Sequence, residues 1–130
     1  MSIIGLDHLV LTVSDLAATR RFYADGLGMR WITFTDDAGL ERPALGFGRQ
    51  KINLHTPARS FEPKAARPTP GSADICLISD AVLDSVVERM RGHGYELALG
   101  PVPRTGATGP IVSLYYRDPD GNLVEVGVPA

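Results

Sequence analysis

Apolar and polar residues alternate with two different periods along this 130-residue chain, and the same order of patterns occurs twice. In the first half, a helix is expected near 15–26, with strands near 6–13, 29–36, 43–48 and 50–56. In the second half, a helix is expected near 80–93, with strands near 73–79, 95–99, 111–117 and 122–128. Each half therefore reads β-α-β-β-β, and the predicted fold class is α+β with two βαβββ modules.

Local signals support the two predicted helices. Asp15 follows Ser14 at the start of the first helix, and both are residue types that cap helix N-termini. Val82, Val86 and Met90 recur every four residues in the second, which is the spacing of one helical face. Each half thus offers one helix with an apolar side to lie against a sheet.

The spacing between corresponding residues shows how the two modules differ in length. Asp74 follows His8 by 66 positions, whereas Glu125 follows Asn53 by 72. The Gly- and Pro-rich segment 100–110 is the expected place for the extra residues, as a loop. A half of about 60 residues buries little core alone, so the two halves should pack as one domain. We expect module one at about 1–56, a Pro-rich linker at 57–72 and module two at 73–130.

Composition narrows the class of protein. The content of 44% hydrophobic and 22% charged residues is ordinary for a globular domain, and the net charge of −2 gives no reason to expect nucleic acid or anionic membranes as partners. The N-terminal residues lack the basic and apolar segments of a secretory signal, so a cytoplasmic location is expected. The single cysteine, Cys76, lies in an apolar strand-like run and is expected to be buried and inert.

Two strands carry isolated groups that suit metal chemistry. The run RDPDGNLVEV predicts a tight turn followed by a strand, on which Glu125 faces away from Val124 and Val126. The run DHLVLTV near the N-terminus is a second strand with His8 near its start. If the two strands belong to one sheet system, an imidazole and a carboxylate converge, which is half of a divalent-metal site.

The patterns DHLVLTVSDL…TRRFYADGLGM and RDPDGNLVEV resemble the vicinal-oxygen-chelate superfamily. That superfamily includes glyoxalase I enzymes, fosfomycin-resistance thiol transferases, methylmalonyl-CoA epimerases, extradiol dioxygenases and bleomycin-binding proteins. The resemblance implies that the sheets are curved and mixed and enclose a cleft for a small-molecule substrate. It also implies a homodimer, because small members commonly pair two chains.

The resemblance also implies a ligand set for a divalent metal ion. Four-ligand members take one ligand from the first and one from the last strand of each half, which here are His8, Asn53, Asp74 and Glu125. His8 and Glu125 have the expected residue types. Asn53 stands where a glutamate is typical, and Asp74 where a histidine or glutamine is typical.

His55 is an alternative ligand from the first half. It lies two residues after Asn53 and so projects from the same strand face. His8, His55 and Glu125 form a 2-His-1-carboxylate combination suited to Zn, Fe, Mn, Co or Ni, with Asp74 as a possible fourth ligand.

Three residues are candidates for contact with a substrate. Arg104, in the predicted 100–110 loop, could bind a carboxylate or phosphate, or it could be a solvated loop residue. Tyr115 and Tyr116 face opposite sides of their strand, and an inward Tyr115 could orient a substrate oxygen. Asn53 is the third candidate if it is not a metal ligand.

Two classes of function follow from the resemblance. The first is a lactoylglutathione lyase-like metalloenzyme, in which the ion chelates neighbouring substrate oxygens, Glu125 is the base and the reaction passes through an enediolate-type intermediate. The alternative is a metal-free module that binds a small molecule or antibiotic, as bleomycin-resistance proteins do. Extradiol dioxygenase and thiol transferase are further enzyme options.

Overall fold

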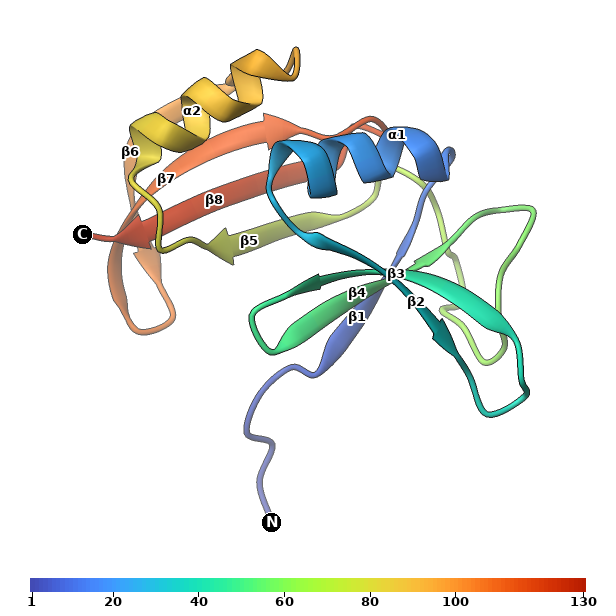
Figure 1. Ribbon diagram of the computed structural model, residues 1–130. Coiled ribbons are helices and arrows are strands. Elements are labelled where there is room, and N and C mark those ends of the chain that lie inside the picture. The colour runs from blue at the N-terminus through green and yellow to red at the C-terminus, as the bar shows by residue number, and fades with distance from the viewer. The chain divides into compact units, whose positions relative to one another are not determined.

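The computed structural model describes residues 1–130, and the chain divides into two compact units, Met1–Pro70 and Gly71–Ala130 (Figure 1). Each unit contains one four-stranded mixed sheet and one helical segment. The order of elements is β-α-β-β-β in both units, which confirms the predicted α+β class with two repeated modules.

The N-terminal unit is built on a sheet with the strand order β1-β4-β3-β2, in which β1 runs parallel to β4 and the other pairs are antiparallel. The helix α1 continues directly into a π-helical turn, η1. The bounds are β1 His8–Thr12, α1 Leu16–Arg20, η1 Arg21–Gly26, β2 Arg30–Thr35, β3 Glu41–Phe47 and β4 Gln50–His55.

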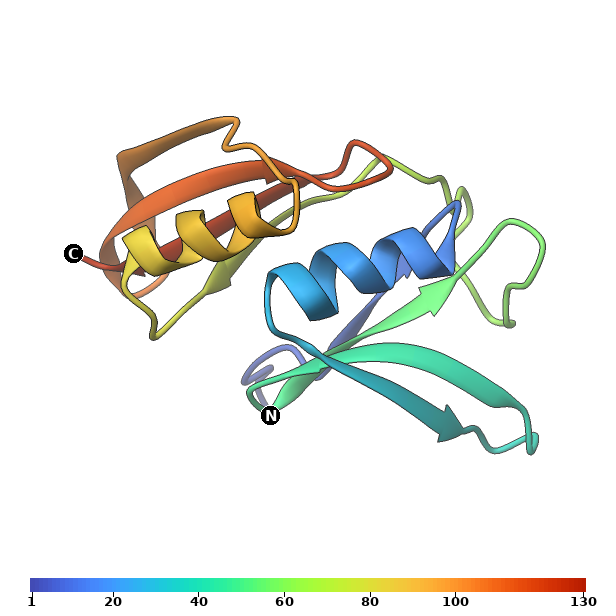
Figure 2. The ribbon, with the colours of Figure 1, turned by 45° about the horizontal axis from the view of Figure 1, so that its top comes forward.

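The first helix begins at the predicted cap. Asp15 Oδ1 accepts hydrogen bonds from the backbone N–H groups of Ala17 at 2.9 Å and Ala18 at 3.1 Å. These bonds satisfy two donors that have no partner inside the helix. Phe22 and Tyr23 in η1 are fully buried, with ring centroids 4.8 Å apart in an edge-to-face arrangement. The helical segment lies against one face of the sheet (Figures 1 and 2).

The two faces of this sheet differ in chemistry. The face toward α1 carries the buried side chains of Leu11, Leu45, Ile52 and Leu54. The opposite, helix-free face carries polar groups, because strand residues alternate between faces. The helix-free face of the first sheet includes His8, Arg42, Lys51, Asn53 and His55.

The C-terminal unit repeats this plan with the strand order β5-β8-β7-β6, in which β5 is parallel to β8. Its helix covers the face that holds Leu114, Tyr116, Val124 and Val126 (Figure 1). Neither helical segment has the length and the apolar character of a membrane-spanning helix. The bounds are β5 Asp74–Ile78, α2 Leu83–Gly92, β6 Leu99–Gly106, β7 Gly109–Arg117 and β8 Leu123–Pro129.

The prediction for segment 95–110 is wrong. Residues 95–98 lie outside the strands, and most of the expected 100–110 loop forms the hairpin of β6 and β7, with Gly106 opposite Gly109. Pro101 and Pro103 are tolerated in β6 because it is an edge strand, where a residue without an N–H group need not break a ladder. Arg104 therefore lies on a strand rather than in a loop.

The turn before β8 has the predicted form. Gly121 has a φ of +86°, a conformation that favours glycine. Asp118 accepts hydrogen bonds from the backbone N–H of Asn122 at 2.9 Å and from its side-chain amide at 2.8 Å. Asn122 Oδ1 in turn accepts a 2.8 Å bond from the backbone N–H of Ala73. The turn is thus tied to the chain just before β5.

Candidate functional site

His8 lies at the start of β1 with its ring held by the preceding residue. His8 Nδ1 is 2.8 Å from Asp7 Oδ1, and the His8 side chain is 44% exposed. A carboxylate accepts hydrogen bonds, so the pair is satisfied when Nδ1 carries the proton. Nε2 then keeps its lone pair and can bind a metal ion or accept a proton.

His55 is in a different situation on the same face. It is buried, and its Nε2 lies 3.1 Å from Nη2 of Arg42. A guanidinium group only donates, so Nε2 of His55 is the acceptor and its proton lies on Nδ1, which is buried without a partner. Burial, and then the charge of Arg42, lower the pKa of His55. Its one available lone pair is therefore occupied by a cation.

Arg42 is a candidate site residue that the sequence analysis missed. Its guanidinium carbon lies 4.4 Å from the ring centroid of Phe61 and 5.2 Å from that of Phe34. Its nearest carboxylate oxygen, on Asp36, is 3.9 Å away, and its Nε is buried without a partner. The strand was predicted to begin at residue 43, and Phe61 fell in the predicted linker. Extending the alternation from Ala44 by two residues would have placed Arg42 on the polar face.

Asn53 contributes an oxygen without a partner. It lies beside Val10 of β1 and Ala44 of β3 in the sheet register and is 4% exposed. Its Oδ1 is buried and accepts no hydrogen bond. A buried acceptor in this state is unfavourable by about 1–3 kcal/mol, so it is a natural contact for a bound donor or cation.

Glu125 occupies the corresponding place in the C-terminal unit. It lies beside Cys76 of β5 and Tyr115 of β7 on the helix-free face, while Val124 and Val126 are buried on the other, as predicted. The hydroxyl of Ser113 donates a 2.6 Å hydrogen bond to Glu125 Oε2. This bond orients the carboxylate.

Cys76 is exposed, so its predicted burial is wrong; β5 is an edge strand of its sheet. Partial desolvation of its thiol, followed by the charge of Glu125 and a hydrogen bond to it, raises the pKa of Cys76 to about 11. The thiol therefore stays protonated near neutral pH and is a weak nucleophile. Asp74 lies two residues earlier on the same face, is exposed, and contributes to the same shift.

The two predicted substrate-binding residues of the second half contact each other. Nε of Arg104 donates a 2.9 Å hydrogen bond to the hydroxyl of Tyr115, and its guanidinium carbon lies 5.4 Å from the tyrosine ring centroid. Tyr115 is the direct neighbour of Glu125 in the sheet register. Tyr116 points the other way into the core and is 1% exposed.

The donors available to a metal ion are distributed over both units. The N-terminal unit offers His8 Nε2 and Asn53 Oδ1, and the C-terminal unit offers the carboxylates of Asp74 and Glu125. No group of three or more His, Cys, Asp or Glu side chains is placed to hold an ion. Imidazole nitrogen and carboxylate or amide oxygen are each donor types that suit divalent ions such as Mn, Fe, Co, Ni and Zn.

Comparisons with known proteins agree with this architecture. The family model described as Glyoxalase/Bleomycin resistance protein/Dioxygenase superfamily matches residues 5–126. The virulence protein STM3117 of Salmonella typhimurium is 54% identical over 126 residues, which are 97% of this chain and 85% of that protein. Its crystal structure matches with a TM-score of 0.92 at 52% identity and covers all of both chains.

Two further matches are a glyoxalase domain-containing protein and a lactoylglutathione lyase. The glyoxalase domain-containing protein RDO1 of Mycosarcoma maydis is 49% identical over 127 residues, which are 97% of this chain and 69% of that protein. The crystal structure of lactoylglutathione lyase from Agrobacterium tumefaciens matches with a TM-score of 0.70 at 25% identity, over 98% of this chain and 95% of that one. The chain therefore belongs to the Glyoxalase/Bleomycin resistance protein/Dioxygenase superfamily, the vicinal-oxygen-chelate proteins.

Proposed function

We propose that this protein is a metal-dependent lyase or isomerase that acts on a small substrate with two neighbouring oxygen atoms. The observation that carries the proposal is the contact of 2.8 Å between Asp7 and His8. A metal-binding histidine almost always donates its other ring N–H to a carboxylate or carbonyl, which fixes the tautomer and the ring orientation. His8 has this arrangement with its second nitrogen unoccupied.

The proposed donors are His8 and Asn53 from the first module and Asp74 and Glu125 from the second. We leave His55 out of this set because its lone pair accepts from Arg42 at 3.1 Å. Displacing the guanidinium would also leave a half-buried cation without that partner, which is unfavourable. The bound ion would supply a Lewis acid for the substrate oxygens.

The protein's own side chains then have separate tasks. Glu125, held by Ser113 at 2.6 Å, accepts the proton from the carbon beside a substrate carbonyl. Arg104 can bind an anionic group of the substrate, and its hydrogen bond to Tyr115 limits the positions of its guanidinium. A relative named lactoylglutathione lyase supports this reaction class.

Metal content of the purified protein tests the proposal. We expect about one ion per chain after incubation with Zn, Ni, Mn, Co or Fe, measured by elemental analysis after gel filtration. His8→Ala and Glu125→Gln should lose most of this metal, because each removes one of few donors. His93→Ala, at the end of α2, is the matched control and should keep it. Equal metal content in all four proteins would contradict the proposed ligands.

A second candidate is a metal-free binding protein. It is favoured by the contact between Arg42 and His55. This contact occupies the ring nitrogen with which His55 could otherwise bind a metal ion. The same face also carries Lys51, whose ammonium lies 3.5 Å from the centroid of Phe34, so it suits an anionic or aromatic ligand. Absence of stoichiometric metal with all five ions would favour this candidate over the enzyme.

A further inference from the structure

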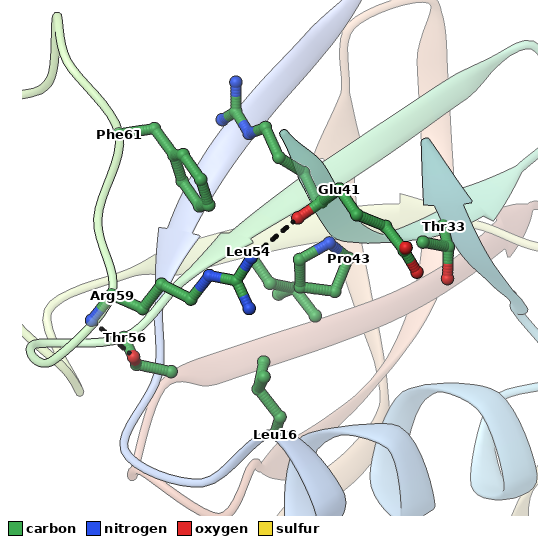
Figure 3. Close-up of a pocket in the computed structure, with 9 residues that line it drawn as sticks. Leu16, Thr33, Glu41, Pro43, Leu54, Thr56, Arg59 and Phe61 are labelled. Atoms are coloured by element: carbon green, nitrogen blue, oxygen red, sulfur yellow. Dashed lines mark hydrogen bonds between the residues drawn. The ribbon is translucent and has the colours of Figure 1, made fainter. Parts of the chain in front are cut away.

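The N-terminal unit contains a cavity of about 350 Å³ at the end of its sheet where β3 begins and β4 ends. This volume lies within the range of small-molecule pockets, about 300–1,000 Å³, near its lower limit. Apolar walls come from Leu16 of α1, Pro43 of β3, Leu54 of β4 and Phe61 of the segment after β4 (Figure 3). The cavity is lined by none of the proposed metal donors.

Two arginines line this cavity, and neither donates a hydrogen bond to a carboxylate. Arg59 Nη2 donates to the backbone carbonyl of Glu41 at 3.1 Å, and Arg59 forms no ion pair. Arg42 has its nearest carboxylate oxygen, on Asp36, at 3.9 Å, and its buried Nε has no acceptor. A guanidinium group is best satisfied by a carboxylate or phosphate. No carboxylate of the cavity accepts a hydrogen bond from Arg59 or from Nε of Arg42, so both arginines can still accept an anionic ligand.

The ring of Phe61 lies near the guanidinium groups of both arginines. Its ring centroid is 4.4 Å from the guanidinium carbon of Arg42, 5.7 Å from that of Arg59 and 5.4 Å from the centroid of His55. A planar aromatic ligand could extend this stack against the apolar walls. Inorganic phosphate has no apolar part, so it would make no favourable contact with the apolar walls of the cavity.

The other end of the cavity limits the charge of a ligand. Figure 3 shows the Glu41 carboxylate beside Thr33, directed away from the guanidinium of Arg59. A second negative charge on the ligand would meet this carboxylate. The charges therefore favour an anion with one negative group over a dianion.

From these observations, we propose that the cavity binds a small aromatic monocarboxylate, with its carboxylate at Arg59 and Arg42 and its ring beside Phe61 and Leu16. This is a second site beyond the proposed metal-dependent reaction, and it uses residues from the N-terminal unit alone.

Fluorescence titration with 2-naphthoate tests the site, in buffer containing EDTA so that the acid cannot bind through a metal ion. The wild-type protein should bind it saturably, with one molecule per chain. Uncharged 2-naphthamide should bind at least about tenfold more weakly, because it lacks the charge that pairs with the arginines.

Variants of Arg59 locate the bound acid. Arg59 is exposed, so Arg59→Gln should fold and weaken 2-naphthoate binding about tenfold, while Arg59→Lys should weaken it less. Arg49→Gln is the matched control, because Arg49 is an exposed arginine that does not line the cavity. Absence of saturable binding, equal affinity for the amide, or an unchanged affinity in Arg59→Gln would each overturn the proposal. These results do not depend on whether the metal site exists.

Discussion

At the scale of single residues, the two histidines on the helix-free face of the first sheet differ in their ability to bind a proton or an ion, because they contact different side chains. His8 contacts a carboxylate, which leaves one ring nitrogen ready to accept a proton or an ion. His55 contacts a guanidinium, which occupies the lone pair and favours the neutral ring. By residue type and strand position, both histidines are equal candidates for a metal ligand. Their hydrogen-bond partners distinguish them, because only His8 keeps a ring-nitrogen lone pair without a partner.

The lowered pKa of His55 predicts a loss of stability in mild acid. Its pKa in the folded chain lies below the ordinary value of 6.5, so the unfolded chain takes up the proton first as the pH falls. The stabilisation is therefore complete above about pH 6.5 and declines as the pH falls below that value. Urea unfolding at pH 7.5 and pH 5.5 should show this decline in the wild-type protein.

His55→Gln provides the test of the assignment. Glutamine keeps an acceptor for Arg42 but does not titrate, so the difference between the two pH values should shrink. His93→Gln is the control and should show the wild-type difference, because His93 follows α2 in the C-terminal unit and is not part of the cluster around His55. An undiminished difference in His55→Gln would show that other groups cause the acid sensitivity.

At the scale of elements, the edge position of β6 explains why the Gly- and Pro-rich pattern of residues 100–110 led to a wrong prediction of a loop. Prolines and glycines in residues 100–110 are typical of a loop, yet Leu99–Gly106 forms β6. An edge strand needs only one of its two sides for hydrogen bonding, so it accepts residues that would break a central strand. Arg104 consequently reaches Tyr115 across the sheet, which a loop position did not predict.

The link between the 118–122 turn and β5 should be important for stability. Asn122 is 1% exposed and bonds to Asp118 and to the backbone of Ala73. Asn122→Ala leaves buried groups without partners and should lower the free energy of unfolding by about 2 kcal/mol. Thr108→Ala, on the exposed β6–β7 turn, should change it by less than about 0.5 kcal/mol. Chemical denaturation of both variants measures the difference, and similar values would contradict this role.

At the scale of the whole molecule, one topology occurs twice with different chemistry. Both units pair their first and last strands in parallel, which puts His8 in the first unit and Asp74 in the second at equivalent strand starts. The helix-free face of the first sheet is rich in cations and imidazoles, whereas that of the second carries two carboxylates, a thiol and Arg104 beside Tyr115. The repeat therefore carries different side chains at equivalent strand positions rather than two copies of one set.

Association of two chains is the prediction at this scale. We propose a homodimer, as the family resemblance implies, with a solution mass near twice the 14.0 kDa of one chain. Sedimentation equilibrium over a hundredfold dilution should keep this mass if the dimer is stable. A mass of one chain at every concentration would show that the protein acts as a monomer.

The sequence by itself determined the order of elements and the two modules. It also determined that Glu125 faces away from its two neighbouring valines and that Tyr115 and Tyr116 face opposite sides. Those features follow from local periods, caps and turns, which are properties of neighbouring residues. The tertiary structure alone decided that Arg42 occupies the lone pair of His55, that Asn53 Oδ1 lacks a partner and that Phe61 lines a cavity. These contacts depend on strand register and on a segment after β4, because pairing across strands joins residues that no local pattern relates.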